Sequence, residues 1–102
     1  MEQDSRARIE ATIKRLLISE LNVSAATVGN TTSATSLLGR GIGLDSVEIM
    51  ALVVSLEEVF QISVPDSELT VNLFESIGAL TDYVAQALLE KRNGWVRLAG
   101  RS

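Results

Sequence analysis

Residues 43–69, with the sequence GLDSVEIMALVVSLEEVFQISVPDSEL, predict a helix that carries two separate apolar faces. At 100° per residue, one broad face is the natural core face and holds Ile49, Leu52, Val53, Leu56, Val59 and Phe60. A second apolar strip lies on a different face, bordered by acidic residues, and consists of Val47, Met50 and Val54. Exposed apolar side chains rimmed by charge are typical of a surface that docks a partner. The alternative is that this helix is central in a bundle and is buried on two sides.

The start of this helix is marked by Asp45, Ser46 and Glu48. Asp45 can cap the helix and Glu48, three residues later, can close a capping box, which would make Ser46 an ordinary first-turn residue. The same geometry also suits a phosphate group on Ser46, because unpaired N–H groups and the positive end of the helix dipole point outward there. The two interpretations are therefore compatible.

Three glycines at alternate positions, Gly39, Gly41 and Gly43, precede the helix. They suggest a phosphate-binding loop, but no strand pattern precedes them and neither GxGxxG nor a GK[ST] ending is present. We therefore reject a nucleotide-binding loop. The glycines are better explained by a sharp turn that leaves the following residues uncovered.

The rest of the chain predicts an all-α fold. Four helices are expected at about residues 4–21, 45–60, 66–71 and 76–91. They form a four-helix bundle with three longer helices, one short helix and a long loop between helices one and two. This loop, residues 22–44, is rich in Ser, Thr, Asn and Gly and is expected to have one helical turn near Leu37. Asp66 is expected to cap the short helix, and Gly94 to stop the last one.

One domain is expected over residues 1–92, followed by a tail at residues 93–102 that has no clear periodicity and is a candidate for disorder. No apolar run approaches 18 residues and the first twenty lack the apolar core of a secretory signal, so we expect a cytoplasmic protein without membrane insertion. The chain contains no Cys and no His, which excludes a thiolate nucleophile, a Ser-His-Asp relay and an imidazole metal site. We expect no catalytic residues, no metal site and no enzymatic activity.

Charge is distributed unevenly along the chain, whose net charge is −4. No Lys or Arg lies between Arg40 and Lys91, whereas nine Asp and Glu residues do. A negative electrostatic potential over half a domain repels nucleic acids and attracts basic protein surfaces. The alternative is that these carboxylates only solvate helix faces. We expect a monomer without nucleic-acid partners.

The segment 43–69 resembles the core of acyl carrier proteins, and the resemblance extends over about residues 5–90. It is carried by an Asp-Ser pair that opens a helix, a Leu-Glu-Glu-x-Phe ending and an Ile-x-Val-Pro-Asp connection. The resemblance implies that Ser46 takes up a 4′-phosphopantetheine arm from coenzyme A by the action of a phosphopantetheinyl transferase. It also implies that Asp45 helps position this magnesium-dependent reaction.

The resemblance further implies a surface for partner enzymes. Glu48, Glu57 and Glu58 fall where carriers meet basic docking patches on acyl-loading, condensing or acyltransferase enzymes. Val47, Met50 and Val54 match apolar docking positions of the same family. The implied function is to carry acyl intermediates as thioesters in fatty-acid, specialised-lipid or polyketide-type biosynthesis.

Some positions depart from this pattern. Val47 replaces the more usual Leu after the serine, and Ala51 and Val59 stand where housekeeping fatty-acid carriers tend to have acids. These departures favour a specialised, free-standing carrier. Two alternatives stay open, a peptidyl or aminoacyl carrier and a helical adaptor without a prosthetic group.

Overall fold

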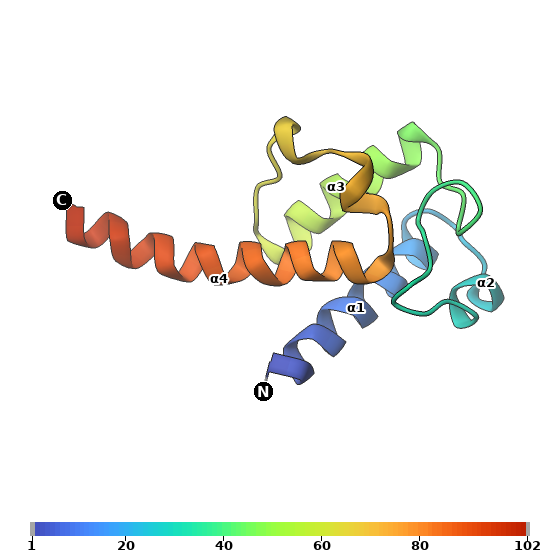
Figure 1. Cartoon of the computed structure of the whole chain (residues 1–102), viewed down its shortest axis with the longest axis horizontal. Helices are drawn as coiled ribbons and strands as arrows, with labels where there is room; N and C mark the ends of the chain where they lie inside the picture. Colours follow the sequence, from blue (N-terminus) through green and yellow to red (C-terminus); the bar gives the residue numbers. More distant parts are fainter. Residues whose placement is uncertain (1, 102) are drawn as a thin grey trace.

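The structure, a computed structural model, describes the backbone of residues 2–101 and the side chains of residues 5–92. It contains four α-helices: α1 (Glu2–Ser19), α2 (Ala25–Gly29), α3 (Ser46–Phe60) and α4 (Ile77–Arg101). Two short 3₁₀ turns, η1 (Asp66–Glu68) and η2 (Val71–Phe74), connect α3 to α4. Residues 2–101 form no strand, and three of the helices are long, which confirms the predicted all-α class (Figure 1).

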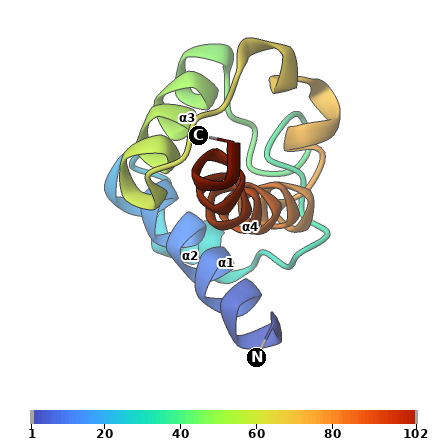
Figure 2. The ribbon, with the colours of Figure 1, turned by 90° about the vertical axis from the view of Figure 1, so that its left-hand side faces the viewer.

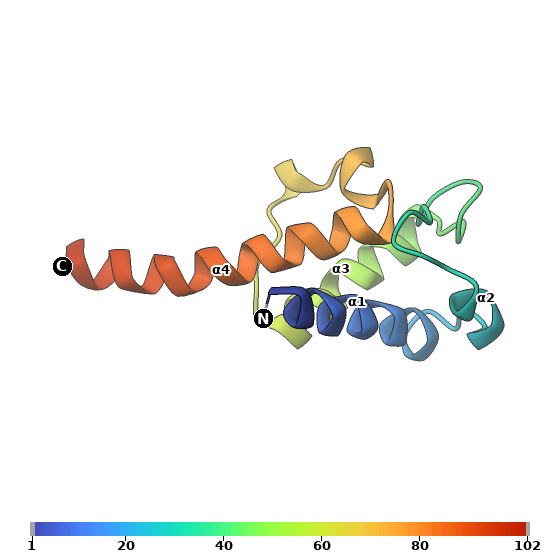
Figure 3. The same cartoon turned by 60° about the horizontal axis from the view of Figure 1, so that its bottom comes forward.

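The helices enclose one core around the first half of α4. Figure 2, which looks nearly along α4, shows α1 and α3 on one side of this helix and the 3₁₀ turns on another. Figure 3 shows α1 running beneath α4. The four α-helices, the long loop and η2 all contribute apolar side chains, and the most deeply buried are Ile13, Leu17, Leu37, Leu52, Leu56, Ile77, Leu80 and Val84. No helix in the described part of the chain is long and apolar enough to cross a membrane.

The long loop between α1 and α3 is fixed to the start of α4 by backbone hydrogen bonds. The N–H of Ile77 donates to the Thr35 carbonyl at 2.9 Å, and the N–H of Gly78 donates to the Ser33 carbonyl at 2.8 Å. Leu37 is fully buried, and its N–H donates to the Phe74 carbonyl at 3.2 Å. Because this part of the loop is bonded to η2 and α4, and the Leu44 N–H donates to the Leu37 carbonyl at 2.9 Å, the segment that precedes α3 has a defined path.

Two predictions about short elements were wrong. The helical turn expected near Leu37 lies instead at α2, where the Ser24 hydroxyl caps the helix by accepting the Thr27 N–H at 3.0 Å. The single helix expected from Asp66 is split into η1 and η2 by the extended backbone of Thr70, and Asp66 provides no cap. This split lets Leu73 and Phe74 turn into the core.

Two predictions about helix ends and faces also need correction. Helix α4 does not stop near Lys91 but continues through Gly94 to Arg101, and its C-terminal half projects away from the other elements (Figure 1). One glycine costs a helix about 1 kcal/mol relative to alanine, which is not enough to end it.

Val59 was placed on the core face but is 49% exposed, since it lies about 70° from the centre of that face in the last turn of α3. The domain boundary at residue 92 stays a prediction.

Candidate functional site

The start of α3 is held by a complete capping box. The N–H of Glu48 donates to Oδ1 of Asp45 at 2.8 Å, and the N–H of Asp45 donates to Oε1 of Glu48 at 3.0 Å. Asp45 occupies the N-cap position with extended backbone angles, as the sequence pattern predicted. The first turn of α3 is therefore fixed by two reciprocal hydrogen bonds.

Ser46 is the first residue of α3 and is exposed to solvent. The hydrogen bonds formed among described side chains include none from its hydroxyl group, so the Oγ atom is available for reaction. The helix N-terminus beside it presents unpaired N–H groups and a positive partial charge, which favour a phosphodiester at this position. The residues present thus fit a covalently attached phosphate group.

The loop before α3 makes a tight turn that depends on glycine. The N–H of Ile42 donates to the Ser36 carbonyl at 2.8 Å, and a Cβ atom at Gly41 would lie 1.8 Å from that same carbonyl oxygen. Gly43 has a φ of +79°, a conformation that residues with side chains rarely adopt. The glycines shape the backbone before Ser46, in agreement with the sequence analysis.

An apolar groove of about 320 Å³ lies beside Ser46, between the start of α3 and the 3₁₀ turns. Only three polar residues line it, Asp45, Ser46 and Thr70. Its apolar lining comes from three segments, the loop, α3 and η1–η2, and consists of Leu38, Leu44, Ile49, Met50, Leu69, Val71 and Phe74. Sequence reasoning did not identify Leu69 and Val71 as site residues, because their position depends on how the two 3₁₀ turns fold back over α3.

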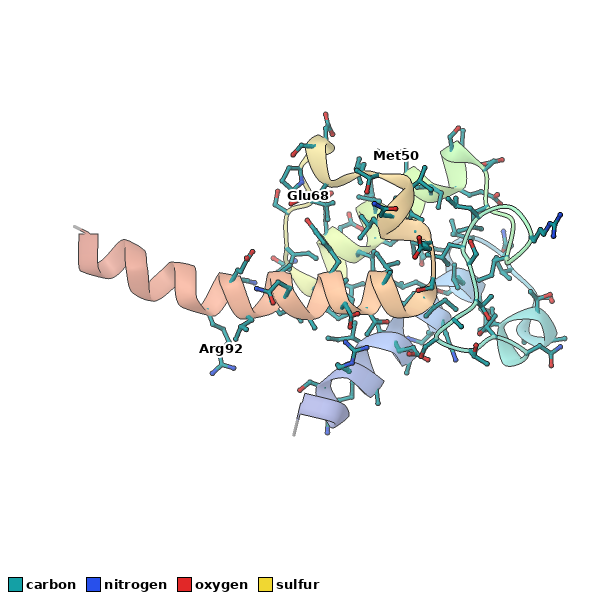
Figure 4. All side chains as sticks on the ribbon, in the orientation of Figure 1. Met50, Glu68 and Arg92 are labelled. Carbon is teal, nitrogen blue, oxygen red and sulfur yellow. The ribbon has the colours of Figure 1, made fainter. Side chains whose placement is uncertain are left out.

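The second apolar strip of α3 faces solvent. Val47 is 76% exposed, Met50 is 45% exposed and Val54 is 50% exposed. In Figure 4, Met50 lies toward the upper edge of the molecule, away from α4. The alternative that α3 is buried on two sides is therefore wrong, while a docking role for the strip stays a prediction. The exposed Val71 on η2 adds a further apolar side chain beside the same groove.

The three predicted acidic contact residues differ in what their carboxylates do. Glu48 closes the capping box, and Oε2 of Glu57 accepts a hydrogen bond from the Val64 N–H at 2.8 Å. Glu58 is exposed, and the described side-chain hydrogen bonds include none to its carboxylate. Glu58 is therefore the member of this set best able to meet a basic patch.

The described side chains also form grooves away from Ser46, of which two are relevant here. One, of about 580 Å³, is formed by the segment after α3 and by α4, and it includes Tyr83, Glu68 and Glu90. Burial, and then the carboxylates of Glu68, Glu90 and Glu57, raise the pKa of the Tyr83 phenol. The other is formed by α1 and α4 and contains the Arg6–Asp82 ion pair. Arg92, labelled in Figure 4, also lines it.

A comparison with known protein families decides the class of this site. The family model described as "Phosphopantetheine attachment site" matches residues 11–84, which is more than two thirds of the chain and includes the start of α3. The chain belongs to this family of phosphopantetheine-carrying proteins. No solved structure matches the chain.

Membership of this carrier family settles three points. The prosthetic group is 4′-phosphopantetheine, and phosphopantetheinyl transferases install it on carrier domains of this kind. These domains are carriers and not enzymes, since the reactions on the cargo are catalysed by their partners. The adaptor without a prosthetic group is accordingly set aside.

Proposed function

We propose that this protein carries acyl intermediates as thioesters on a 4′-phosphopantetheine arm attached to Ser46. The attachment to Ser46 is supported by its exposed hydroxyl at the capped start of α3. In the loading step, Oγ of Ser46 bonds to the β-phosphorus of coenzyme A and the bond from that phosphorus to 3′,5′-ADP breaks. The hydroxyl proton leaves to a base of the transferase, which also supplies the magnesium site that Asp45 helps to position.

The observation that favours an acyl cargo is the apolar groove beside Ser46. An arm attached to Ser46 begins at the edge of this groove, so a hydrocarbon chain on its thiol can fold back against Leu69, Val71 and Phe74. Burial of each methylene group contributes about 0.8 kcal/mol. A charged aminoacyl group would lose hydration against this lining, where only Asp45, Ser46 and Thr70 offer polar groups to replace it.

The partners that we propose are acyl-loading, condensing or acyltransferase enzymes with basic patches, in fatty-acid, specialised-lipid or polyketide-type biosynthesis. The exposed strip of α3 together with Glu58 supports this choice, since apolar and acidic groups are combined on one helix. The peptidyl or aminoacyl carrier is the second candidate. It is favoured by the exposed Ala51 and Val59 in place of acids, which leave α3 less acidic than in housekeeping fatty-acid carriers.

The cargo can be identified by mass spectrometry of the loaded protein purified from its own host. We expect an acyl thioester that neutral hydroxylamine releases as the corresponding hydroxamate. An amino acid or peptide on the arm would decide for the second candidate.

A structural test compares octanoyl and alanyl thioesters on the same arm. We expect the octanoyl group to shift the methyl resonances of Leu69 and Val71, whereas the alanyl group leaves them unchanged. Equal shifts from both cargoes would remove the support that the groove gives to an acyl function.

A further inference from the structure

Glu48 is turned back toward the start of its own helix. Its Oε1 atom accepts the N–H of Asp45 at 3.0 Å, and its side chain is half-buried. A carboxylate that contacts a partner's basic patch should instead be free and exposed, as Glu58 is. The geometry of Glu48 therefore indicates a role within the carrier itself.

We propose that Glu48 is a positioning residue for the loading of Ser46 and that it acts through Asp45. This inference rests on the proposed role of Ser46 as the attachment site. Two hydrogen bonds join residues 45 and 48, and the backbone of Ser46 lies between them in the chain. Together they hold the backbone from Asp45 to Glu48, which includes Ser46, in one conformation.

The capping box also fixes the carboxylate of Asp45. Its Oδ1 atom is directed into the first turn by the Glu48 N–H at 2.8 Å. The described hydrogen bonds include none to Oδ2, so this oxygen remains available on the residue that precedes the exposed Ser46. Without the Glu48 side chain, the Asp45 N–H loses its acceptor and the N-cap can move. A smaller fraction of molecules would then present Asp45 and Ser46 in one arrangement to the transferase.

The substitution Glu48→Gln separates this role from a charge contact. A glutamine side-chain oxygen can still accept the Asp45 N–H and keep the capping box, but it carries no charge. Glu48→Ala removes both the acceptor and the charge. Glu20→Gln, at an exposed position after α1, is a control for the loss of one negative charge.

The test measures steady-state loading of each variant with coenzyme A, magnesium and a broad-specificity phosphopantetheinyl transferase. For Glu48→Ala we expect kcat to fall on the order of tenfold with little change in KM, as for other residues that orient a functional side chain. For Glu48→Gln and Glu20→Gln we expect kcat and KM within about twofold of the wild-type values, because the capping box stays intact. Circular dichroism of each variant establishes that it is folded, and faster amide exchange at Asp45 in Glu48→Ala reports the lost bond independently of loading.

Three results would overturn the inference. One is a Glu48→Gln variant as impaired as Glu48→Ala, because charge would then be the decisive property. Another is a loss that appears only in KM, which indicates a docking contact. The third is an unimpaired Glu48→Ala variant. Failure of the wild-type protein to load would instead overturn the role of Ser46, and the inference with it, so the two failures are distinguishable.

Discussion

Oε2 of Glu57 lies 2.8 Å from the backbone nitrogen of Val64 and accepts its N–H hydrogen bond. This bond ties the C-terminal end of α3 to the buried residue Val64, which follows it. The neighbouring Glu58 is exposed and makes no comparable bond within the described residues. Two adjacent glutamates of one helix thus have different environments, and substitutions at the two positions should have different consequences.

Glu57→Ala should lower the free energy of unfolding by about 1–2 kcal/mol, because the N–H of the buried Val64 loses a charged acceptor. Glu58→Ala should change it by less than about 0.5 kcal/mol. Urea titrations of both variants measure this difference. Equal effects on stability would show that the Glu57–Val64 bond does not contribute. Glu58 is therefore the better position at which to alter charge without affecting the fold.

Glu58→Lys should slow association with a partner enzyme that has a basic docking patch, and the difference from the wild-type rate should shrink as salt is added. Stopped-flow measurements at several ionic strengths test this expectation, with Glu20→Lys as a control outside α3. If both variants slow association equally, net charge and not the surface of α3 steers the partner.

The start of α3 could be predicted from the sequence because it depends on local chemistry. Asp45 and Glu48 are three residues apart, and their capping box needs no distant contact. The exposure of Met50 followed similarly from its angular position on one helix. The Glu57–Val64 bond could not be predicted in this way. It requires the chain to reverse at Gln61, whose left-handed φ of +55° is unusual for a residue other than glycine.

The groove beside Ser46 was also beyond prediction from sequence patterns. It depends on two 3₁₀ turns separated by the extended Thr70, where the expected cap at Asp66 predicted one short helix. The continuation of α4 past Gly94 has a different cause, because a glycine signals a helix end without compelling one. Both errors occur where the local sequence has only a weak structural preference, so that packing or the following residues determine the backbone conformation.

Met50→Gln should change the free energy of unfolding by no more than about 0.5 kcal/mol, since Met50 is 45% exposed. Leu52→Ala is the matched control on the buried face of the same helix and should cost about 2–5 kcal/mol. The two denaturant titrations are directly comparable. A loss near 2 kcal/mol in Met50→Gln would mean that the apolar strip contributes to the core.

Gly41→Ala should destabilise the protein, because the new Cβ atom would lie 1.8 Å from the Ser36 carbonyl oxygen and would force the loop to move. We expect a cost of at least about 1 kcal/mol, typical of overpacking at a fixed site. Gly29→Ala is the control, since nothing lies within 4 Å of its added Cβ atom. This control should be neutral or stabilise by about 0.4–1 kcal/mol. Thermal unfolding of both variants distinguishes a close backbone contact from a general effect of glycine replacement.

The raised pKa of Tyr83 predicts that the stability of the protein depends on pH in the alkaline range. Tyr83 is the single tyrosine of the chain, and burial with the nearby carboxylates of Glu68, Glu90 and Glu57 raises its pKa above the value of about 10 for a free phenol. Between about pH 10 and this higher folded-state pKa, the native protein binds more protons than the unfolded chain. The free energy of unfolding should therefore fall as pH rises through that interval.

Absorbance of the phenolate measures the Tyr83 titration directly, and its midpoint should lie above about pH 10. As pH rises through the same interval, the free energy of unfolding of the wild-type protein should fall relative to that of the Tyr83→Phe variant. A midpoint below that of a free phenol would contradict the environment described for Tyr83.

Attachment of the arm to Ser46 is the central claim, and intact-mass spectrometry tests it most directly. The wild-type protein and a Ser46→Ala variant are incubated with coenzyme A, magnesium and a phosphopantetheinyl transferase. We predict that the wild-type mass increases by one phosphopantetheine group, that peptide mapping places the group on Ser46, and that the Ser46→Ala mass does not change. Loading of the Ser46→Ala variant at undiminished yield, or attachment to another residue of the wild-type protein, would contradict the account.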